Sequence, residues 1–472
     1  MKSPWIIIIL SVALYSAIDW TEYANLRNGI DLGTYTQILY NISSFHAFPP
    51  FNSILGESAW GDHAHFIMIA LAPLFALYPH DITPLILQII AITTSAWALC
   101  DIAYRRFKNI FFAYAITISY LLFFGIQYAL SFDVHANVFT CALLAWLFWA
   151  YETDKKKLYW LIFALTIITR EDAALFTGAF GFYVAAASLL PSSYGQNRRL
   201  GIITLLISIV YFFTTTYYIM PALQENHTAL AYFDIDKRIF FHPIKLWQNM
   251  FDNSRKVRTF NNSFASFSYL PFFSPFSYLA TAPNFIARFL SGEQQRWGMK
   301  LHYSASLASV LAYGSILGIA MIIRIARRIP IIATKEAYIL IIASIALMYS
   351  TYAISLRDID LPIHQYFSHI NTDINPDAVA MRSHLQTIQK QIPQSDSVAT
   401  ISSFVPVFAT REKVNYIDSA TNFSADWIII SNQYTSWPLS RKEINTAIYN
   451  LKQNPNYVLL ENTNSLFVFK KI

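Results

Sequence analysis

Five short motifs in the chain combine carboxylates with histidines or basic residues. These side-chain types carry out proton transfer and bind anions: a carboxylate can take the proton of a hydroxyl, and a cation can stabilise an anion that leaves. The residues are, in chain order, Asp31; Asp62 and His63; Asp133 and His135; Arg170, Glu171 and Asp172; and Lys300, His302 and Tyr303. We treat them as the candidates for a catalytic or binding site.

Each motif also has a structural explanation when it is taken alone. Asp31 could cap a helix beside the membrane, and Arg170, Glu171 and Asp172 could form an ion pair at a turn. Lys300 could anchor the chain by snorkelling to the interface. The Asp and His side chains would suit a divalent cation, but no local spacing matches a known metal site, so metal binding is left open.

The composition of the chain predicts a membrane protein of many spans. Its 472 residues are 55% apolar and only 13% charged, about half of the ~25% charged residues of soluble domains, and the mean hydropathy is +0.37. Disorder, a collagen-like fibre and a disulfide-stapled secreted domain are excluded. The two cysteines, Cys100 and Cys141, both lie in apolar stretches.

The basic residues orient the chain in the membrane. They gather in clusters between apolar runs: Arg105, Arg106 and Lys108; Lys155, Lys156 and Lys157; Arg198 and Arg199; and Arg324, Arg327 and Arg328. This is the positive-inside pattern of cytoplasmic loops rather than a nucleic-acid groove, so no nucleic-acid partner is expected. Lys2 places the N-terminus in the cytoplasm, which puts the loops 20–63 and 222–265 outside.

A hydrocarbon core needs about 20 apolar residues to be crossed by a helix. The segments that meet this length are 4–19, 82–104, 109–130, 136–152, 173–191, 200–221, 303–323 and 337–355. The short segment 158–169 must also cross to satisfy the charges, whereas 65–78 is expected to be re-entrant or interfacial. Pro271, Pro275 and Pro283 break 266–290 into two expected half-helices. We therefore expect a bundle of about 9–11 spans over residues 1–355, with a cavity beside the broken segment.

Residues 356–472 are polar and predict a small soluble α/β domain on the extracytoplasmic side. Helical patterns cover 376–391 and 440–451, and strand-like runs cover 397–402, 414–417, 427–431, 457–460 and 465–469. The same topology brings all five motifs to the outer face. Because ionisable residues at a membrane rim are costly, this convergence predicts one shared pocket. His65 is expected to face lipid headgroups instead.

The motifs resemble a family of multi-pass bacterial and archaeal membrane proteins of unknown function, placed among the GT-C superfamily of glycosyltransferases. The similar stretches cover roughly residues 20–325. They are Asp31-Leu32-Gly33-Thr34-Tyr35-Thr36-Gln37, Gly61-Asp62-His63, Leu71-Ala72-Pro73-Leu74-Phe75, Asp133-Val134-His135, Thr169-Arg170-Glu171-Asp172, Leu270-Pro271-Phe272-Phe273-Ser274-Pro275 and His302-Tyr303-Ser304-Ala305. The family pattern differs at two points, where this chain has Arg170 for a lysine and separates Asp133 from His135 by one residue.

The resemblance implies an integral membrane glycosyltransferase of the bacterial inner or plasma membrane. It would transfer a sugar from a polyprenyl-phosphate-linked donor to an extracytoplasmic lipid, glycan or protein. In the superfamily an Asp in the first outer loop is the catalytic acid/base, and Asp31 stands at that place. Arg170, Lys300, His302 and Tyr303 would stabilise the leaving phosphate, and the membrane lipid is the expected partner.

Two other functions remain open from the sequence. A transporter or flippase also carries buried ionisable groups near broken helices, but such proteins are usually built from repeats, and none is visible here. A receptor or scaffold would need only an anchor, for which so many spans with polar motifs are excessive.

Overall fold

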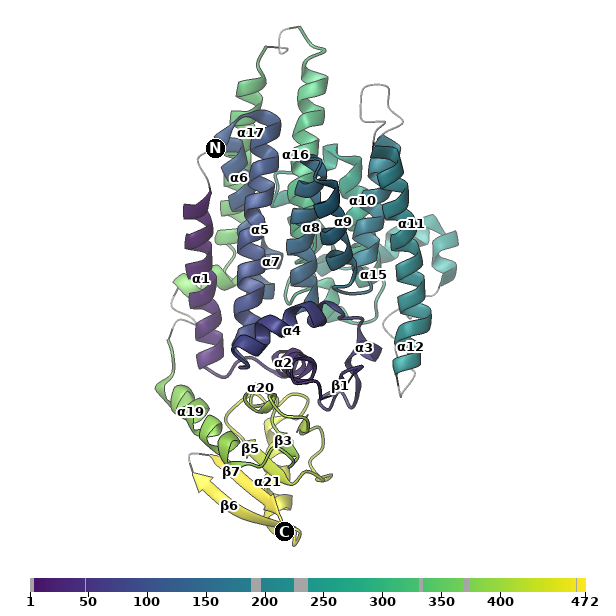
Figure 1. Ribbon diagram of the computed structural model, residues 1–472. Helices are drawn as coiled ribbons and strands as arrows, with labels where there is room; N and C mark the ends of the chain where they lie inside the picture. The colour runs from purple at the N-terminus through teal and green to yellow at the C-terminus, as the bar shows by residue number, and fades with distance from the viewer. Residues whose placement is uncertain are drawn as a thin grey trace.

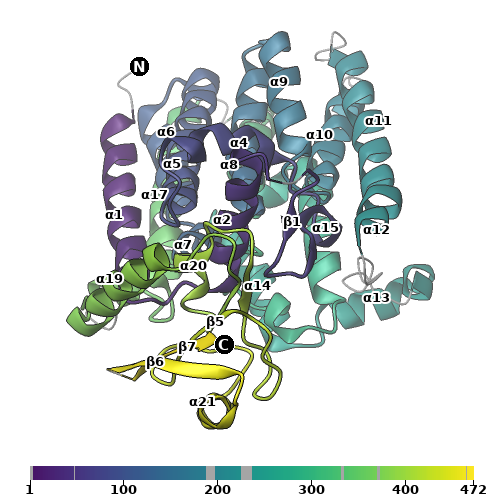
Figure 2. The same cartoon turned by 60° about the horizontal axis from the view of Figure 1, so that its bottom comes forward.

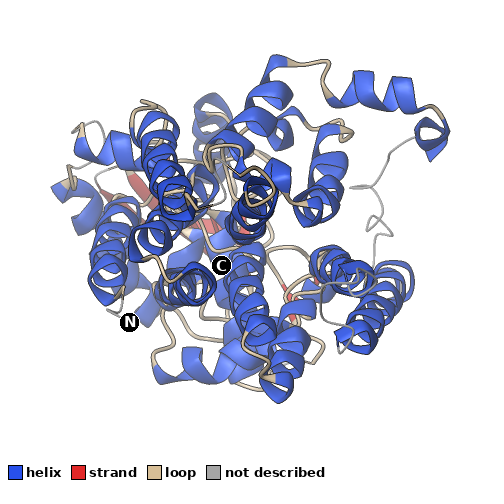
Figure 3. Cartoon of the chain, turned by 90° about the horizontal axis from the view of Figure 1, so that it is seen from above, coloured by secondary structure: helices blue, strands red, loops and turns tan. Residues whose placement is uncertain are grey.

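The computed structural model describes residues 4–46, 48–187, 197–224, 237–330, 334–368, 373–463 and 465–472. A bundle of roughly parallel helices stands on a small α/β domain (Figure 1). The view from above is almost entirely helix, with few strands visible (Figure 3). The expected architecture, a mainly helical bundle with a C-terminal α/β domain, is confirmed.

Five helices of the described residues are long and apolar enough to cross a membrane. They are α1 (Trp5–Ala24), α5 (Thr83–Phe107), α11 with its continuation to Leu223 (Arg198–Leu223), α16 (Leu307–Ala326) and α17 with its continuation to Leu356 (Glu336–Leu356). A sixth span arises if the pair α6 (Ile110–Leu121) and α7 (Phe124–Leu130), bent by 45°, counts as one.

Three more helices of the bundle fall below the length of a full span. They are α8 (Ala136–Glu152), α9 (Lys156–Ile167) and α10 (Ala173–Ala187). At 1.5 Å per residue the 12 residues of α9 reach about 18 Å, short of a ~30 Å core. By length alone, the described residues therefore contain fewer membrane spans than the expected 9–11. The positions of the basic clusters indicate that a segment crosses the membrane, but they do not determine the length of its helix.

Two helices at the lower end of the bundle lie across the direction of the others (Figures 1 and 2). The first is α4 (Ile67–Leu77), which fits the interfacial placement expected for 65–78. The second is α2 (Ile30–Ser43), a helix within the expected loop 20–63. The loop also contains a hairpin of β1 (Phe51–Asn52) and β2 (Glu57–Ser58), followed by α3 (Ala59–Asp62).

The proline-broken segment forms one helix after a short turn, so the expected pair of half-helices is wrong. The turn is η5 (Leu270–Phe273), and the helix is α15 (Pro275–Phe289). Pro275 stands at the start of α15, where a missing N–H costs nothing. Before it, α13 (Pro243–Met250) and α14 (Ser254–Ala265) occupy the described part of the expected loop 222–265; residues 225–236 lie outside the described ranges.

The C-terminal domain has a five-stranded mixed sheet of order β4-β3-β5-β7-β6. Its strands are β3 (Val398–Thr400), β4 (Val414–Tyr416), β5 (Trp427–Ser431), β6 (Tyr457–Thr463) and β7 (Leu466–Lys471). Strand β3 pairs in parallel with β4 and β5, and β7 pairs antiparallel with β5 and β6. The helices are α19 (Pro376–Gln391), α20 (Val405–Phe408) and α21 (Arg441–Gln453), and α18 (Pro362–Phe367) precedes them.

The C-terminal domain is docked on α2 and the hairpin. Its apolar core includes Leu26 and Ile54 from the N-terminal part of the chain. A Cβ added at Gly33 of α2 would lie 2.5 Å from Cγ1 of Val405, so a glycine is needed for this close approach. The Gln37 side chain donates to the backbone oxygen of Arg411 (3.0 Å). The two expected domains therefore share a core across their boundary.

The two ends of the bundle differ. The N-terminus and the turn between α16 and α17 lie at the upper end in Figure 1, and the C-terminal domain lies below the lower end. The turn α16–α17 carries one of the basic clusters used above to orient the chain. The start of α1 and this basic turn thus lie at the end of the bundle opposite the C-terminal domain.

Candidate active site

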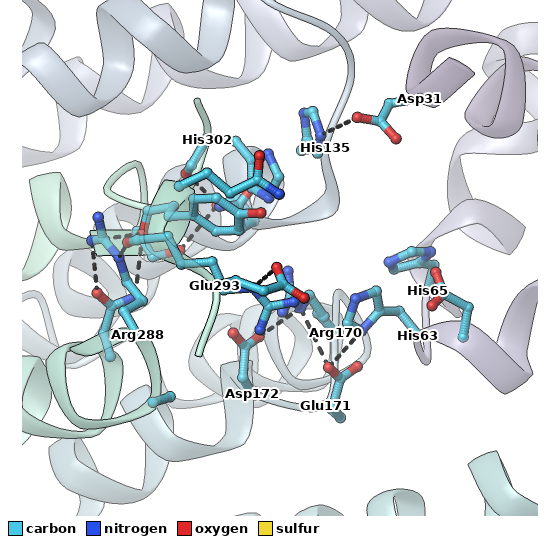
Figure 4. A pocket seen from close by; sticks show the side chains of 18 of the residues that line it. Asp31, His63, His65, His135, Arg170, Glu171, Asp172, Arg288, Glu293 and His302 are labelled. Carbon is cyan, nitrogen blue, oxygen red and sulfur yellow. Dashed lines mark hydrogen bonds and ion pairs between the residues drawn. The ribbon is translucent and has the colours of Figure 1, made fainter. Parts of the chain in front are cut away.

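A polar cavity of about 440 Å³ lies at the end of the bundle that faces the C-terminal domain. Its walls come from α2, the turns α3–α4, α7–α8 and α9–α10, α15, η6 (Gln294–Trp297) and the loop that precedes α16. Most of the candidate residues line it together (Figure 4): Asp31, Asp62, His63, His135, Arg170, Glu171, Asp172, His302 and Tyr303. The five motifs thus meet in one place.

Asp31 lies in the first turn of α2, after the N-cap residue Gly29. The positive end of the helix favours a carboxylate there. Its side chain is 48% exposed, and one oxygen lies 3.2 Å from Nε2 of His135. Asp31 points toward His135 across the cavity wall (Figure 4). A carboxylate so placed can reach a molecule in the cavity.

His135 follows the α7–α8 turn and is held by its neighbours on all sides. Its ring stacks on His302, with centroids 3.5 Å apart, and on Phe132. Its Nδ1 lies 3.3 Å from the backbone oxygen of Asp133. Both ring nitrogens therefore face oxygen acceptors, whereas a neutral imidazole donates from one nitrogen only. His135 thus links Asp31 to the backbone of the α7–α8 turn.

The second imidazole of the stack is neutral. Burial, with His135 alongside, lowers the pKa of His302 well below its usual range. Because two imidazolium rings would repel at this distance, a proton on His135 is compatible only with a neutral His302.

Asp133 does not line the cavity, contrary to its expected role in substrate binding. It is buried behind the wall, where it accepts hydrogen bonds from the backbone of Gly29 (3.1 Å) and the side chain of Asn28 (3.1 Å). Burial, with the charge of Asp31 nearby, raises its pKa to about 6. The residue fixes the start of α2, and it thereby positions Asp31.

The α9–α10 turn builds an ion-paired wall on the other side. Glu171 is buried and lies 2.8 Å from Nδ1 of His63, and it also accepts from the backbone of Ala64 (3.2 Å). The Nε of Arg170 lies 3.4 Å from Glu171 and 3.3 Å from Asp172. The turn predicted as an internal ion pair is one, and it also lines the cavity.

The charges in this wall shift one another's protonation. Burial would raise the pKa of Glu171, but His63 and Arg170 outweigh it and hold that pKa well below its usual range. Burial and Arg170 oppose a charge on His63, yet Glu171 and Asp62 outweigh them and raise its pKa. Burial raises the pKa of Asp172. Glu171 and His63 therefore each favour the charged form of the other.

Sequence reasoning missed two arginines in the cavity. Arg288 of α15 is buried, and its guanidinium donates only to neutral oxygens among the described residues: the backbone of Arg296, Gly298 and Tyr303, and the side chains of Asn284 and Ser304. Arg296 pairs with Glu293 (3.0 Å). Arg288 lies within the apolar segment 266–290, so the rule that flagged other ionisable residues could have found it.

Two further placements correct the sequence predictions. Lys300 does not line this cavity; it lies on two adjacent hollows, one with Glu22 and Tyr128 and one with Arg255. His65 lines the cavity and is buried rather than facing headgroups. Burial, with His63 alongside, lowers its pKa well below its usual range, and the Tyr35 hydroxyl lies 3.2 Å from its Nε2.

A metal has no ready-made set of ligands here. Within the described ranges no group of three or more His, Cys, Asp or Glu side chains is arranged to hold an ion.

Comparisons place this site in a known family. The family model described as "Predicted membrane protein (DUF2079)" matches residues 22–468. The chain belongs to this family. The resemblance to a membrane family of unknown function is thus confirmed, and the chain is an integral membrane protein. No curated protein matches the sequence of this DUF2079 protein.

Solved structures share its fold at low identity. ArnT from Cupriavidus metallidurans bound to undecaprenyl phosphate has a TM-score of 0.52 and 12% identity, over 100% of this chain and 99% of that chain. The apo state of the same ArnT gives 0.48 and 12%, over 99% and 98%. The archaeal oligosaccharyltransferase AglB from Archaeoglobus fulgidus gives 0.41 and 10%, over 91% and 69%. The ArnT likeness confirms the expected GT-C-like fold of this DUF2079 protein.

Proposed function

We propose that this DUF2079 protein is a glycosyltransferase that transfers a sugar from a polyprenyl-phosphate-linked donor to an acceptor hydroxyl outside the cytoplasm. The observation that carries the proposal is a half-exposed carboxylate, Asp31, which lies in the first turn of α2 and contacts His135 in a cavity that also contains buried cations. The ArnT structure with the same fold holds undecaprenyl phosphate, which supports a lipid-linked donor.

Asp31 acts as the general base. A displacement at the anomeric carbon forms one bond to the acceptor oxygen and breaks one bond to the phosphate oxygen. The acceptor proton moves to the Asp31 carboxylate, which is open to the cavity and hydrogen-bonded to His135. One base is enough, because the phosphate leaves as an anion and needs no proton.

The leaving phosphate is stabilised by fixed positive charge. Arg288 lines the cavity, and its described hydrogen-bond partners are all neutral, so its charge remains for an anion. Arg170 lies on the same cavity beside Asp172, which is partly exposed. Such preorganised donors are worth about 10²–10³ in rate each.

The lipid chain of the donor has a groove next to the cavity. An apolar hollow of about 430 Å³ runs between α10, α11 and α15 and is lined by residues such as Leu205, Phe212 and Leu279. Leu175 and Pro283 line both this hollow and the cavity, so the two spaces adjoin. A phosphate in the cavity could thus carry an isoprenoid chain that leaves sideways between the helices.

We place the cavity and the C-terminal domain outside the cytoplasm and the N-terminus inside. The basic clusters, which favour the cytoplasmic side, occupy the turns at the opposite end of the helices. A reporter fused after residue 360 is expected to be active only outside the cytoplasm.

The deciding experiment compares wild type, Asp31→Asn and Asp31→Glu in the native host deleted for the gene. Envelope lipids, glycans and glycoproteins are measured by mass spectrometry, and protein abundance by blotting of membranes. Asp31→Asn should abolish a sugar-bearing product that wild type restores, at equal abundance. Full product formation by Asp31→Asn would contradict the assignment. Uptake or flipping of a substrate without new glycosidic bonds would favour the transporter or flippase instead.

A further inference from the structure

One wall of the cavity comes from the C-terminal domain. Trp437 lies in the connection between β5 and α21, and it lines the same cavity as Asp31. Of residues 373–463 and 465–472, it is the one that contributes to the lining. The sequence contains no motif at this position, so only the docking of the domain reveals it.

The indole is exposed although it belongs to a packed domain. It is 64% exposed, and its ring centroid is 6.4 Å from that of Tyr416. No described residue accepts a hydrogen bond from its Nε1. A large exposed aromatic at the edge of a polar cavity is typical of a binding surface rather than of a core.

The loop that carries Trp437 is held in position before any ligand binds. The Ser402 hydroxyl and the Ser403 backbone both donate to the backbone oxygen of Thr435 (2.9 and 3.2 Å). The Ser436 hydroxyl donates to the backbone oxygen of Leu439 (2.9 Å). A fixed ring loses little freedom when it binds a partner.

The domain itself is fixed relative to Asp31. Val405 packs against Gly33, two residues after Asp31 on α2. The Ser53 hydroxyl donates to the backbone oxygen of Val414 (2.7 Å) and accepts from its N–H (2.9 Å). The base and the indole thus reach the cavity from two elements that are packed together.

The positions of the apolar groove and of Trp437 around the cavity indicate which substrate the indole would contact. The apolar groove meets the cavity at Leu175 and Pro283, on the bundle side, so that side suits the lipid-linked donor. Trp437 stands in the part of the wall that the C-terminal domain contributes. A molecule that meets Trp437 and Asp31 together comes from the aqueous side, and it presents a hydroxyl to the base.

We propose that Trp437 is the acceptor platform of the enzyme and that it stacks on the C–H face of a carbohydrate ring while its indole N–H donates to a hydroxyl. A pyranose offers both features, a flat apolar face and hydroxyls at its rim, whereas a peptide hydroxyl or a glycerol headgroup lacks the flat face. This inference rests on the proposed function, because Asp31 supplies its base. It assigns the acceptor class to a saccharide.

The test uses the full-length protein in detergent and a panel of methyl glycosides, with saturation-transfer NMR as the measure of binding. The variants are Trp437→Ala, Trp437→Phe and, as a control of similar exposure in the same domain, Tyr449→Ala; Tyr449 is 65% exposed and does not line the cavity. Wild type should show saturation transfer to ring C–H protons. Trp437→Ala should weaken binding about tenfold. Trp437→Phe keeps a ring to stack but loses the N–H donor, so it should bind less tightly than wild type and more tightly than Trp437→Ala, while Tyr449→Ala stays near wild type.

Asp31→Asn separates this inference from the proposed function. It should lose the sugar-bearing product in the host but keep glycoside binding. Equal binding by Trp437→Ala and wild type, or no saturation transfer to any glycoside by wild type, overturns the acceptor platform and leaves the transferase proposal standing. An active Asp31→Asn variant overturns the transferase itself, whatever the glycosides do.

Discussion

The cavity contains two carboxylate–imidazole pairs that differ in their surroundings. In the first, Asp31 and His135 are 3.2 Å apart and the carboxylate is 48% exposed. In the second, Glu171 and His63 are 2.8 Å apart and the carboxylate is 1% exposed. Glu171 is also held by Arg170 and by the backbone of Ala64. The carboxylate is thus exposed in the first pair and enclosed by other groups in the second.

The difference shows which of these two pairs fits the proposed role of a base. A base needs a lone pair that a substrate can reach, and of the two carboxylates only Asp31 is exposed. The oxygens of Glu171 already have partners, and its lowered pKa makes it a weak proton acceptor. Its role is to hold Arg170 and His63 as charged parts of the wall. The following predictions test this division of roles.

The largest expected effect is on folding, from Glu171→Gln. The change leaves Arg170 and His63 without their buried counter-charge, which should cost about 3–5 kcal/mol of stability. Thermal unfolding in detergent, followed by tryptophan fluorescence, is the measurement. Asp31→Asn is the matched control and should melt near wild type. Equal melting temperatures for Glu171→Gln and Asp31→Asn would show that the two pairs do not differ in their contribution to stability.

A smaller effect is expected from Gly33→Ala, which acts on the first pair alone. The new methyl group would overlap Val405, and overpacking of this kind costs about 1–3 kcal/mol. Hydrogen–deuterium exchange should rise in α2 and α20 and stay unchanged at the α9–α10 turn. Gly178→Ala, whose added Cβ would lie 3.3 Å from Ser208, is a milder helix control. Faster exchange at the α9–α10 turn would show that the pairs are not independent.

Substitution of His135 should lower mainly the transfer rate, and substitution of His63 should lower mainly the stability. His135→Gln removes the imidazole that contacts and orients the Asp31 carboxylate, so we expect about a tenfold loss of transfer rate with a modest change in melting temperature. His63→Gln should do the reverse, because it leaves Glu171 buried with one cation fewer. Product formation and melting are measured on the same preparations. The opposite ranking would assign the base to the second pair.

The smallest effect is a pH dependence of stability. The raised pKa of His63 means that its stabilising contribution is complete below the unfolded value of about 6.5 and is lost as the pH rises through the folded value. The lowered pKa of Glu171 means that its contribution is lost below about 4.3. The melting difference between wild type and His63→Gln should therefore be greatest near pH 5–6 and shrink toward pH 9. A difference that grows with pH would contradict the pairing.

Much of this site follows from the sequence because charge and hydropathy decide on which face a residue emerges. That reasoning brought Asp31, His135 and His302 together. The same reasoning could not distinguish a residue that lines the cavity from one buried behind it, as Asp133 is. Asp133 binds the backbone at the start of α2, and the motifs in the sequence do not indicate that contact. Lys300 emerges on the correct face but points to another hollow.

The remaining parts needed the fold itself. Hydropathy treats 266–290 as a break, and only the observed helix α15 shows Arg288 entering the cavity. Likewise, nothing in the sequence distinguishes a tryptophan in a polar loop as a site residue. Trp437 is recognised as part of the cavity only because Val405 packs on Gly33 and docks the C-terminal domain there. The lengths of the helices could not be predicted either, because the charges indicate the direction in which a segment crosses the membrane, whereas packing determines how long its helix is.

The inclusion of Leu26 and Ile54 in the core of the C-terminal domain has a consequence for biosynthesis. The ribosome makes these two residues near the beginning and their partners near the end, so every membrane helix is inserted before they are covered. A nascent chain stopped before β5 would sit correctly in the bilayer with bare apolar side chains and an open cavity. The cavity therefore gains the wall that contains Trp437 only after the strands of the C-terminal domain have folded onto Leu26 and Ile54.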